Sequence, residues 1–178
     1  FGLVGSEMCI RDSVAATIAG NGDLKGVAPD AKIYAYKVCH SSGCPQSAIV
    51  AAIEASMDPD NTGNFENPLD VINMSLGGGG DHLTTPYKDY IEAAIEVGVT
   101  VVASAGNSGP GGNTICRTNP ENGNHSSICC PSCVEGVISV AASTSDGELH
   151  WWDEDYDPSL PGVDGVAGFS SRGPTQLI

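Results

Sequence analysis

Apolar and polar positions group along the chain into blocks that predict strands and helices in turn. Short, largely apolar runs, typical of strands, occupy residues 32–38, 70–74, 99–103 and 137–141. Apolar side chains recur at helical spacing in residues 14–19, 46–57 and 87–97. Apolar strands that alternate with helices of about ten residues predict a parallel sheet covered on both faces. We therefore expect an α/β fold with a doubly wound, mostly parallel sheet and helices on both faces.

Two of the predicted strands end in small and polar residues. The first of these ends comprises Ser75, Leu76, Gly77 and Gly78, and the second comprises Ser104, Ala105, Gly106 and Asn107. In an open parallel sheet, the ligand crevice lies beyond the carboxyl ends of the strands. The two strand ends therefore predict a binding groove. Asn107 would supply it with a side-chain amide that can donate a hydrogen bond.

Length and charge narrow the class of protein. The chain has 178 residues, 40% of them hydrophobic, which is enough for one packed core and too short for two domains. It begins with Phe1 and ends directly after a turn signal, so we expect an incomplete domain. Lys and Arg number 7 against 22 Asp and Glu, and the net charge of -15 argues against nucleic acid or an anionic membrane as partner. The sequence shows neither an apolar run of about 18 residues, as a spanning helix needs, nor a signal peptide.

The chain has more cysteines than a cytosolic enzyme with reduced thiols usually contains. Their seven positions are 9, 39, 44, 116, 129, 130 and 133. Cys39 and Cys44 could close a small disulfide loop, and Cys116 could pair within the cluster at 129–133. The spacing of Cys130 and Cys133 also fits two zinc ligands, although the sequence lacks a second such pair. Disulfides are the favoured interpretation, with free thiols and a metal site as alternatives.

Four segments carry a resemblance to a known family. They are Gly-Val-Ala-Pro-Asp-Ala at 26–31, Val-Ile-Asn-Met-Ser-Leu-Gly-Gly at 71–78, Ser-Ala-Gly-Asn-Ser-Gly-Pro at 104–110 and Phe-Ser-Ser-Arg-Gly-Pro-Thr at 169–175. In this order and at these separations they resemble the subtilisin-like serine proteases, peptidase family S8. The resemblance implies a secreted endopeptidase, extracellular or periplasmic, that hydrolyses peptide bonds of proteins or peptides through a Ser-His-Asp triad.

The resemblance also implies roles for the two strand ends. Asn107 matches the asparagine whose amide, with the backbone N–H of the nucleophilic serine, binds the oxyanion of the tetrahedral intermediate. Residues 75–78 match the strand that pairs with the substrate backbone and forms one wall of the main specificity pocket. Residues 104–106 match the opposite wall, where glycine lets an extended peptide approach closely. Ser170 and Ser171 lack the Gly-x-Ser-x-Gly elbow of a nucleophile, so we expect them to be structural.

The chain departs from the family at the triad. Ile10 stands where the family has the general-base His, the nucleophile is expected beyond residue 174, and the Asp is expected before Phe1. We therefore expect this chain alone to be inactive. Residues 1–13 have no counterpart in the family and resemble translated sequencing-adapter read-through. The expected organisation is a non-native segment at 1–13, including Cys9, and a partial catalytic domain at 14–178.

Particular residues bear on other functions. A non-catalytic extracellular peptide-binding module is the main alternative, and the residue at position 10 of the complete protein discriminates it from a protease. A dinucleotide site would need a third glycine where Thr114 stands. Residues 58–63 begin like a calcium loop, but Leu69 occupies the position of the bidentate Glu, so an acidic turn is favoured. We assign no metal ligand and no cofactor, although calcium is possible in the complete protein, and we expect the four histidines, His40, His82, His125 and His150, to be surface residues.

Overall fold

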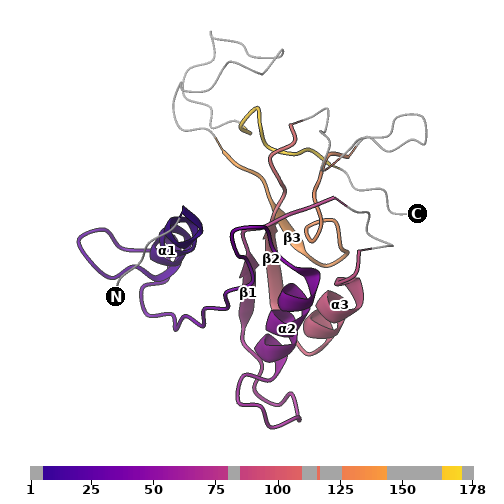
Figure 1. Ribbon diagram of the computed structural model, residues 1–178. Coiled ribbons are helices and arrows are strands. Elements are labelled where there is room, and N and C mark those ends of the chain that lie inside the picture. Colours follow the sequence, from indigo (N-terminus) through magenta and orange to yellow (C-terminus); the bar gives the residue numbers. More distant parts are fainter. Residues whose placement is uncertain (1–5, 80–84, 110–115, 117–125, 144–165, 174–178) are drawn as a thin grey trace. The chain divides into compact units, whose positions relative to one another are not determined.

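The computed structural model describes residues 6–79, 85–109, 116, 126–143 and 166–173 (Figure 1). The chain divides into two units, Phe1–Ala52 and Ile53–Ile178. Each unit is described by itself below. The second unit contains the sheet and both strand ends that the sequence singles out.

Helix α1, Ser6–Ala19, is the main element of the first unit. It begins at Ser6 instead of residue 14, where the apolar periodicity starts. The chain then turns back on the helix, because the N–H of Gly26 donates to the carbonyl of Gly20 at 2.8 Å. A Cβ at position 26 would lie 2.7 Å from the carbonyl oxygen of Ile18, so only glycine allows this return. The turn predicted at residues 26–30 is confirmed.

The strand predicted at residues 32–38 is wrong. These residues belong to no strand or helix, and Ile33 and Tyr34 are 48% and 56% exposed. A strand is held by hydrogen bonds to a neighbouring strand. Among the described residues, no partner strand pairs with this segment. Its β-branched and aromatic side chains are therefore insufficient to make a strand by themselves.

The second unit contains a three-stranded parallel sheet. Strands β1 (Val71–Met74), β2 (Thr100–Ser104) and β3 (Ile138–Val140) lie in the order β1-β2-β3 (Figure 1). Val71 is opposite Thr100, and Val102 is opposite Ile138. Parallel neighbours need a crossover connection, which helix α3 (Lys88–Glu96) provides between β1 and β2. The predicted α/β fold with a parallel sheet is confirmed.

One face of this sheet packs into the core. Helix α3 contacts β2, and its Ile91 and Ala94 are fully buried. On β2, Val101 and Ala103 alternate onto the buried face and are each 1% exposed. The helix predicted over residues 46–57 is α2, Gln46–Met57, whose Ile53 is also buried. Residues on the opposite face of the sheet are more open, and they include Val71, Ile138 and Val140.

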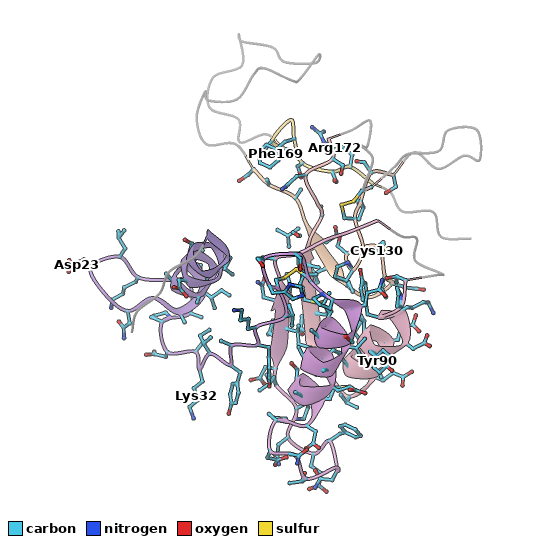
Figure 2. All side chains as sticks on the ribbon, in the orientation of Figure 1. Asp23, Lys32, Tyr90, Cys130, Phe169 and Arg172 are labelled. Atoms are coloured by element: carbon cyan, nitrogen blue, oxygen red, sulfur yellow. A yellow bond between two sulfur atoms is a disulfide. The ribbon has the colours of Figure 1, made fainter. Side chains whose placement is uncertain are left out.

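Three disulfides join the six cysteines whose side chains are described. They are Cys39–Cys44, Cys116–Cys129 and Cys130–Cys133. The first pair and the reach of Cys116 into the 129–133 cluster are confirmed predictions. The zinc interpretation of the Cys130 and Cys133 spacing is wrong, because their sulfurs are bonded to each other (Figure 2). No helix in the described part of the chain has the length and apolarity to cross a membrane.

Replacing Ile91 with Ala should destabilise the protein. Ile91 is fully buried between α3 and the sheet, and truncation of such a side chain leaves a cavity that costs about 2–5 kcal/mol. The matched control is Ile138→Ala, because Ile138 is 53% exposed and such surface changes stay within about 0.5 kcal/mol. Urea denaturation followed by circular dichroism measures both. Equal losses in the two variants would contradict this account of the core.

Candidate active site

The carboxyl ends of β1 and β2 lie side by side, as the sequence predicts. The register pairs Met74 with Ala103, so the segments that follow each strand start at the same edge of the sheet. We call residues 75–78 the first wall and residues 104–107 the second wall. The hydroxyl of Ser104 donates to the carbonyl of Leu76 at 3.3 Å and so joins the two walls. The predicted site residues are thus brought together.

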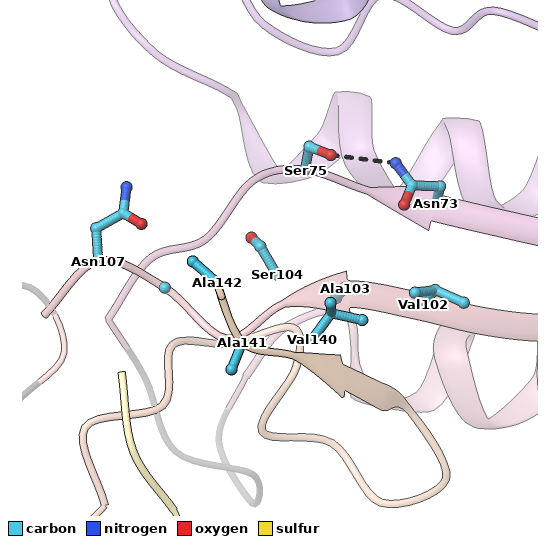
Figure 3. Close-up of a pocket in the computed structure, with 10 residues that line it drawn as sticks. Asn73, Ser75, Val102, Ala103, Ser104, Asn107, Val140, Ala141 and Ala142 are labelled. Atoms are coloured by element: carbon cyan, nitrogen blue, oxygen red, sulfur yellow. Dashed lines mark hydrogen bonds between the residues drawn. The ribbon is translucent and has the colours of Figure 1, made fainter. Parts of the chain in front are cut away.

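A cavity of about 350 Å³ opens at this edge of the sheet (Figure 3). Four of the predicted site residues line it, namely Ser75, Ser104, Gly106 and Asn107. The other four predicted residues, Leu76, Gly77, Gly78 and Ala105, belong to the walls but do not line this cavity. Sequence reasoning missed the contribution of the end of β3, which adds Val140, Ala141 and Ala142. The sequence could have revealed this contribution, because the strand predicted at 137–141 is a third parallel strand and ends at the same edge of the sheet.

Asn73 also lines the cavity and was not singled out from the sequence. Its side-chain amide donates to the hydroxyl of Ser75 at 3.1 Å (Figure 3). Asn73 faces the open side of the sheet, because its neighbours Ile72 and Met74 alternate onto the other face. A polar residue inside an apolar strand is the sequence feature that could have found it.

Asn107 is exposed beyond the end of β2 (Figure 3). Among the described residues, its side-chain amide has no hydrogen-bond partner. The backbone on both sides of it is fixed by one residue: the N–H of Ser171 donates to the carbonyl of Gly106 at 3.0 Å, and the N–H of Ser108 donates to the hydroxyl of Ser171 at 3.1 Å. Asn107 is therefore a free donor on a loop that cannot easily shift.

The segment that contains Ser171 is structural, as expected. Ser170 and Ser171 are 1% and 3% exposed, and the hydroxyl of Ser170 accepts a hydrogen bond from the N–H of Ala142 at 3.1 Å. The N–H of Gly109 donates to the carbonyl of Phe169, which Figure 2 labels, at 2.9 Å. Each serine hydroxyl is thus engaged with the backbone of a neighbouring loop. The interpretation of Ser170 and Ser171 as structural residues is confirmed.

A short segment at Cys129 and Cys130 connects the two walls. Gly78 pairs with Cys130 in an antiparallel bridge, with N···O distances of 2.9 and 3.1 Å. The N–H of Cys129 donates to the carbonyl of Ala105 at 2.9 Å. Both walls are therefore hydrogen-bonded to the same segment, which fixes the separation between them.

The described residues show no cluster of side chains that could form a metal centre. His40 is exposed, with its Nδ1 at 2.8 Å from the hydroxyl of Ser42, which confirms that it is a surface residue. The other three histidines lie outside the described residues. No group of three or more His, Cys, Asp or Glu side chains that could hold a metal ion occurs in the part of the chain that is described.

The acidic loop at 58–63 is held by its own backbone. The carboxylate of Asp58 accepts hydrogen bonds from the N–H of Thr62 at 2.9 Å and of Gly63 at 2.8 Å. Desolvation raises the pKa of Asp58, but these two N–H groups, together with side-chain hydrogen bonds to Asp60 and Thr62, hold that pKa below its ordinary value. The carboxylate thus has protein partners, which fits the favoured interpretation of an acidic turn. Calcium in the complete protein stays a prediction.

Fold and site together define a class: an α/β protein whose crevice lies at the carboxyl edge of a parallel sheet. Comparison with known proteins is more specific, since a profile of the subtilase family matches residues 13–177. The chain belongs to the subtilase family.

Individual relatives agree with this assignment. Serine protease AprX of Bacillus subtilis (strain 168) is 31% identical over 172 residues, 94% of this chain and 34% of that protein. The CO(2)-response secreted protease of Arabidopsis thaliana is 34% identical over 152 residues, 76% of this chain and 17% of that protein. The solved S41 psychrophilic protease has a TM-score of 0.65 and 29% identity, covering 90% of this chain and 44% of that one. The chain therefore spans less than half the length of these relatives.

Replacing Gly106 with Ala should destabilise the second wall. Gly106 has φ +108, and a Cβ there would overlap the Cys129 sulfur and lie 2.9 Å from the Ser171 hydroxyl. The control Gly43→Ala has the same kind of backbone (φ +126) in open space, and the left-handed conformation alone should cost it about 1–2 kcal/mol. Overpacking should cost Gly106→Ala about 1–3 kcal/mol more. Urea denaturation compares the two, and equal losses would show that position 106 has room for a methyl group.

Proposed function

We propose that this chain is part of the catalytic domain of a secreted serine endopeptidase. Membership of the subtilase family supports a peptidase acting on proteins or peptides. The single observation that carries the proposal is Asn107, an exposed amide without a described partner on a loop fixed from both sides by Ser171. Such an arrangement suits a donor that is preorganised for a charge that develops only during reaction. The relative named as a secreted protease supports an extracellular location.

The first wall is suited to bind an extended peptide. Within the described part of the chain, the N–H and C=O of Gly77 have no hydrogen-bond partner, whereas its neighbour Gly78 is paired with Cys130. A peptide that adds to a free strand edge gains main-chain hydrogen bonds of this kind. The substrate backbone would then lie along the first wall, with its scissile carbonyl directed toward Asn107.

The chemistry would proceed through a tetrahedral intermediate. A serine oxygen attacks the scissile carbonyl while a histidine takes the serine proton, and the carbonyl oxygen becomes an oxyanion. The Asn107 amide would donate one hydrogen bond to that oxyanion, together with the backbone N–H of the serine. Collapse of the intermediate expels the amine, which receives the proton from the histidine, and leaves an acyl-serine from which water then releases the acyl group. The triad residues would lie outside this chain.

A second candidate is a peptide-binding module that does not cut. The observation that favours it is Ile10, which stands where the family resemblance places the general base. Isoleucine has no group that can accept a proton. We propose instead that residues 1–13 are not native and that 14–178 are the partial catalytic domain, so that the encoded residue at position 10 decides between the two functions.

The complete gene product should cleave a fluorogenic peptide and react with a serine-directed phosphonate. Long-read sequencing of the locus recovers the complete gene and reads the codon at position 10, where we expect His. The 178-residue chain alone, the matched control, should neither cleave nor react. If the locus encodes Ile10 and the complete protein resists the phosphonate while still binding peptides, the protein is a peptide-binding module and the proposal of a protease is wrong.

Replacing Asn107 with Ala in the complete gene product should lower kcat with little change in KM, because the oxyanion is absent from the bound substrate and develops only on the way to the tetrahedral intermediate. Loss of this donor in a related subtilisin costs about 10²–10³ in turnover, and we carry that magnitude over. Asn21→Ala in the first unit is the control and should leave kcat unchanged. A rise in KM at constant kcat would place Asn107 in substrate binding rather than in oxyanion stabilisation.

A further inference from the structure

The side chain of Cys129 lies between the two walls of the site. A Cβ at Gly77, in the first wall, would be 3.0 Å from the Cβ of Cys129. A Cβ at Gly106, in the second wall, would overlap the Cys129 sulfur. Cys129 itself is only 5% exposed. Both walls therefore carry glycine where they face Cys129, and the space between them at this point is occupied.

The Cys116–Cys129 disulfide lies across the gap between the first wall and the second wall. The sulfur of Cys116 lies 3.7 Å from the carbonyl oxygen of Gly78, on the side of the first wall. The sulfur of Cys129 lies 3.9 Å from the hydroxyl of Ser108, which follows the second wall. One sulfur thus contacts each side, and the bond between them spans the distance. A disulfide has strict geometry, so it cannot rotate aside as a leucine or methionine side chain could.

We propose that the Cys116–Cys129 disulfide is a specificity-determining element that restricts the gap between the walls to small substrate side chains. The inference rests on the proposed function, because it takes the first wall as the strand that holds the substrate. The side chain that precedes the scissile bond would enter between the walls beside the disulfide, where glycine, alanine or serine needs the least space. Leucine or phenylalanine would have to displace a covalent bridge whose Cys129 is held in place because its backbone N–H donates to the carbonyl of Ala105.

The expected ratio of kcat/KM between large and small side chains can be taken from the discrimination that apolar pockets of fixed size show. A difference of one methylene group in an apolar pocket changes kcat/KM by about 10–200-fold. Phenylalanine exceeds alanine by much more than one methylene. We therefore expect discrimination of at least about tenfold between these two residues before the scissile bond.

The first experiment uses the complete gene product and a series of fluorogenic peptides that differ only in the residue before the scissile bond. Alanine and serine should give kcat/KM values at least about tenfold above those of leucine and phenylalanine. Equal values, or a preference for phenylalanine, would overturn the inference. If the complete protein neither cleaves any peptide nor reacts with the phosphonate, the proposed function itself fails and the inference with it.

The second experiment removes the disulfide with the double variant Cys116→Ser, Cys129→Gly, which leaves no unpaired thiol from that pair. The ratio of kcat/KM for phenylalanine to that for alanine should rise about tenfold or more in this variant. Cys39→Ser, Cys44→Ser is the matched control, because it removes a disulfide from the first unit and should leave the ratio unchanged. A ratio unchanged in both variants would contradict the proposal. Should circular dichroism show that the first variant is unfolded, the peptide series on the unaltered protein decides alone.

Discussion

The parallel ladder between β1 and β2 is the constraint on which the rest of the site depends. It pairs Met74 with Ala103, and it therefore starts both walls at one edge of the sheet. Without that register, Ser104 could not reach the carbonyl of Leu76. The ladder in turn depends on α3, whose Ile91 and Ala94 bury the face of β2 opposite the cavity. The chemistry on one side of the sheet is thus supported by apolar packing on the other.

Loops from distant parts of the sequence complete what the ladder begins. Cys129 and Cys130 are hydrogen-bonded to both walls, and Ser171 holds the backbone on either side of Asn107. Cys129, Cys130 and Ser171 are buried, and their main-chain groups need partners because an unpaired buried amide or carbonyl is costly. The same contacts explain why Gly106 carries no side chain: the sulfur of Cys129 and the hydroxyl of Ser171 fill the space. The exposed amide of Asn107 therefore sits on a closely packed base.

Helix α2 and the loop closed by Cys39 and Cys44, which have local partners, were predicted well, whereas the strand predicted at 32–38 has no neighbouring strand among the described residues and was wrong. Helix α2, Gln46–Met57, has the predicted bounds because its hydrogen bonds lie within one segment. The small loop closed by Cys39 and Cys44 is local in the same sense. Residues 32–38 have the composition of a strand, but a strand requires a neighbour that composition does not supply.

The sequence by itself determined the parallel α/β class, the two strand ends and the family resemblance, because each is written in a short run of consecutive residues such as 71–78 or 104–110. Only the tertiary structure decided which cysteine pairs with Cys116, that Ser171 fixes the Asn107 loop, and that a disulfide lies between the walls. The reason is physical: these contacts join residues far apart in the sequence, for example 13 positions for Cys116 and Cys129 and 63 positions for Ser108 and Ser171. Such contacts depend on how the loops meet in space, whereas residue type and spacing fix only what each segment does alone.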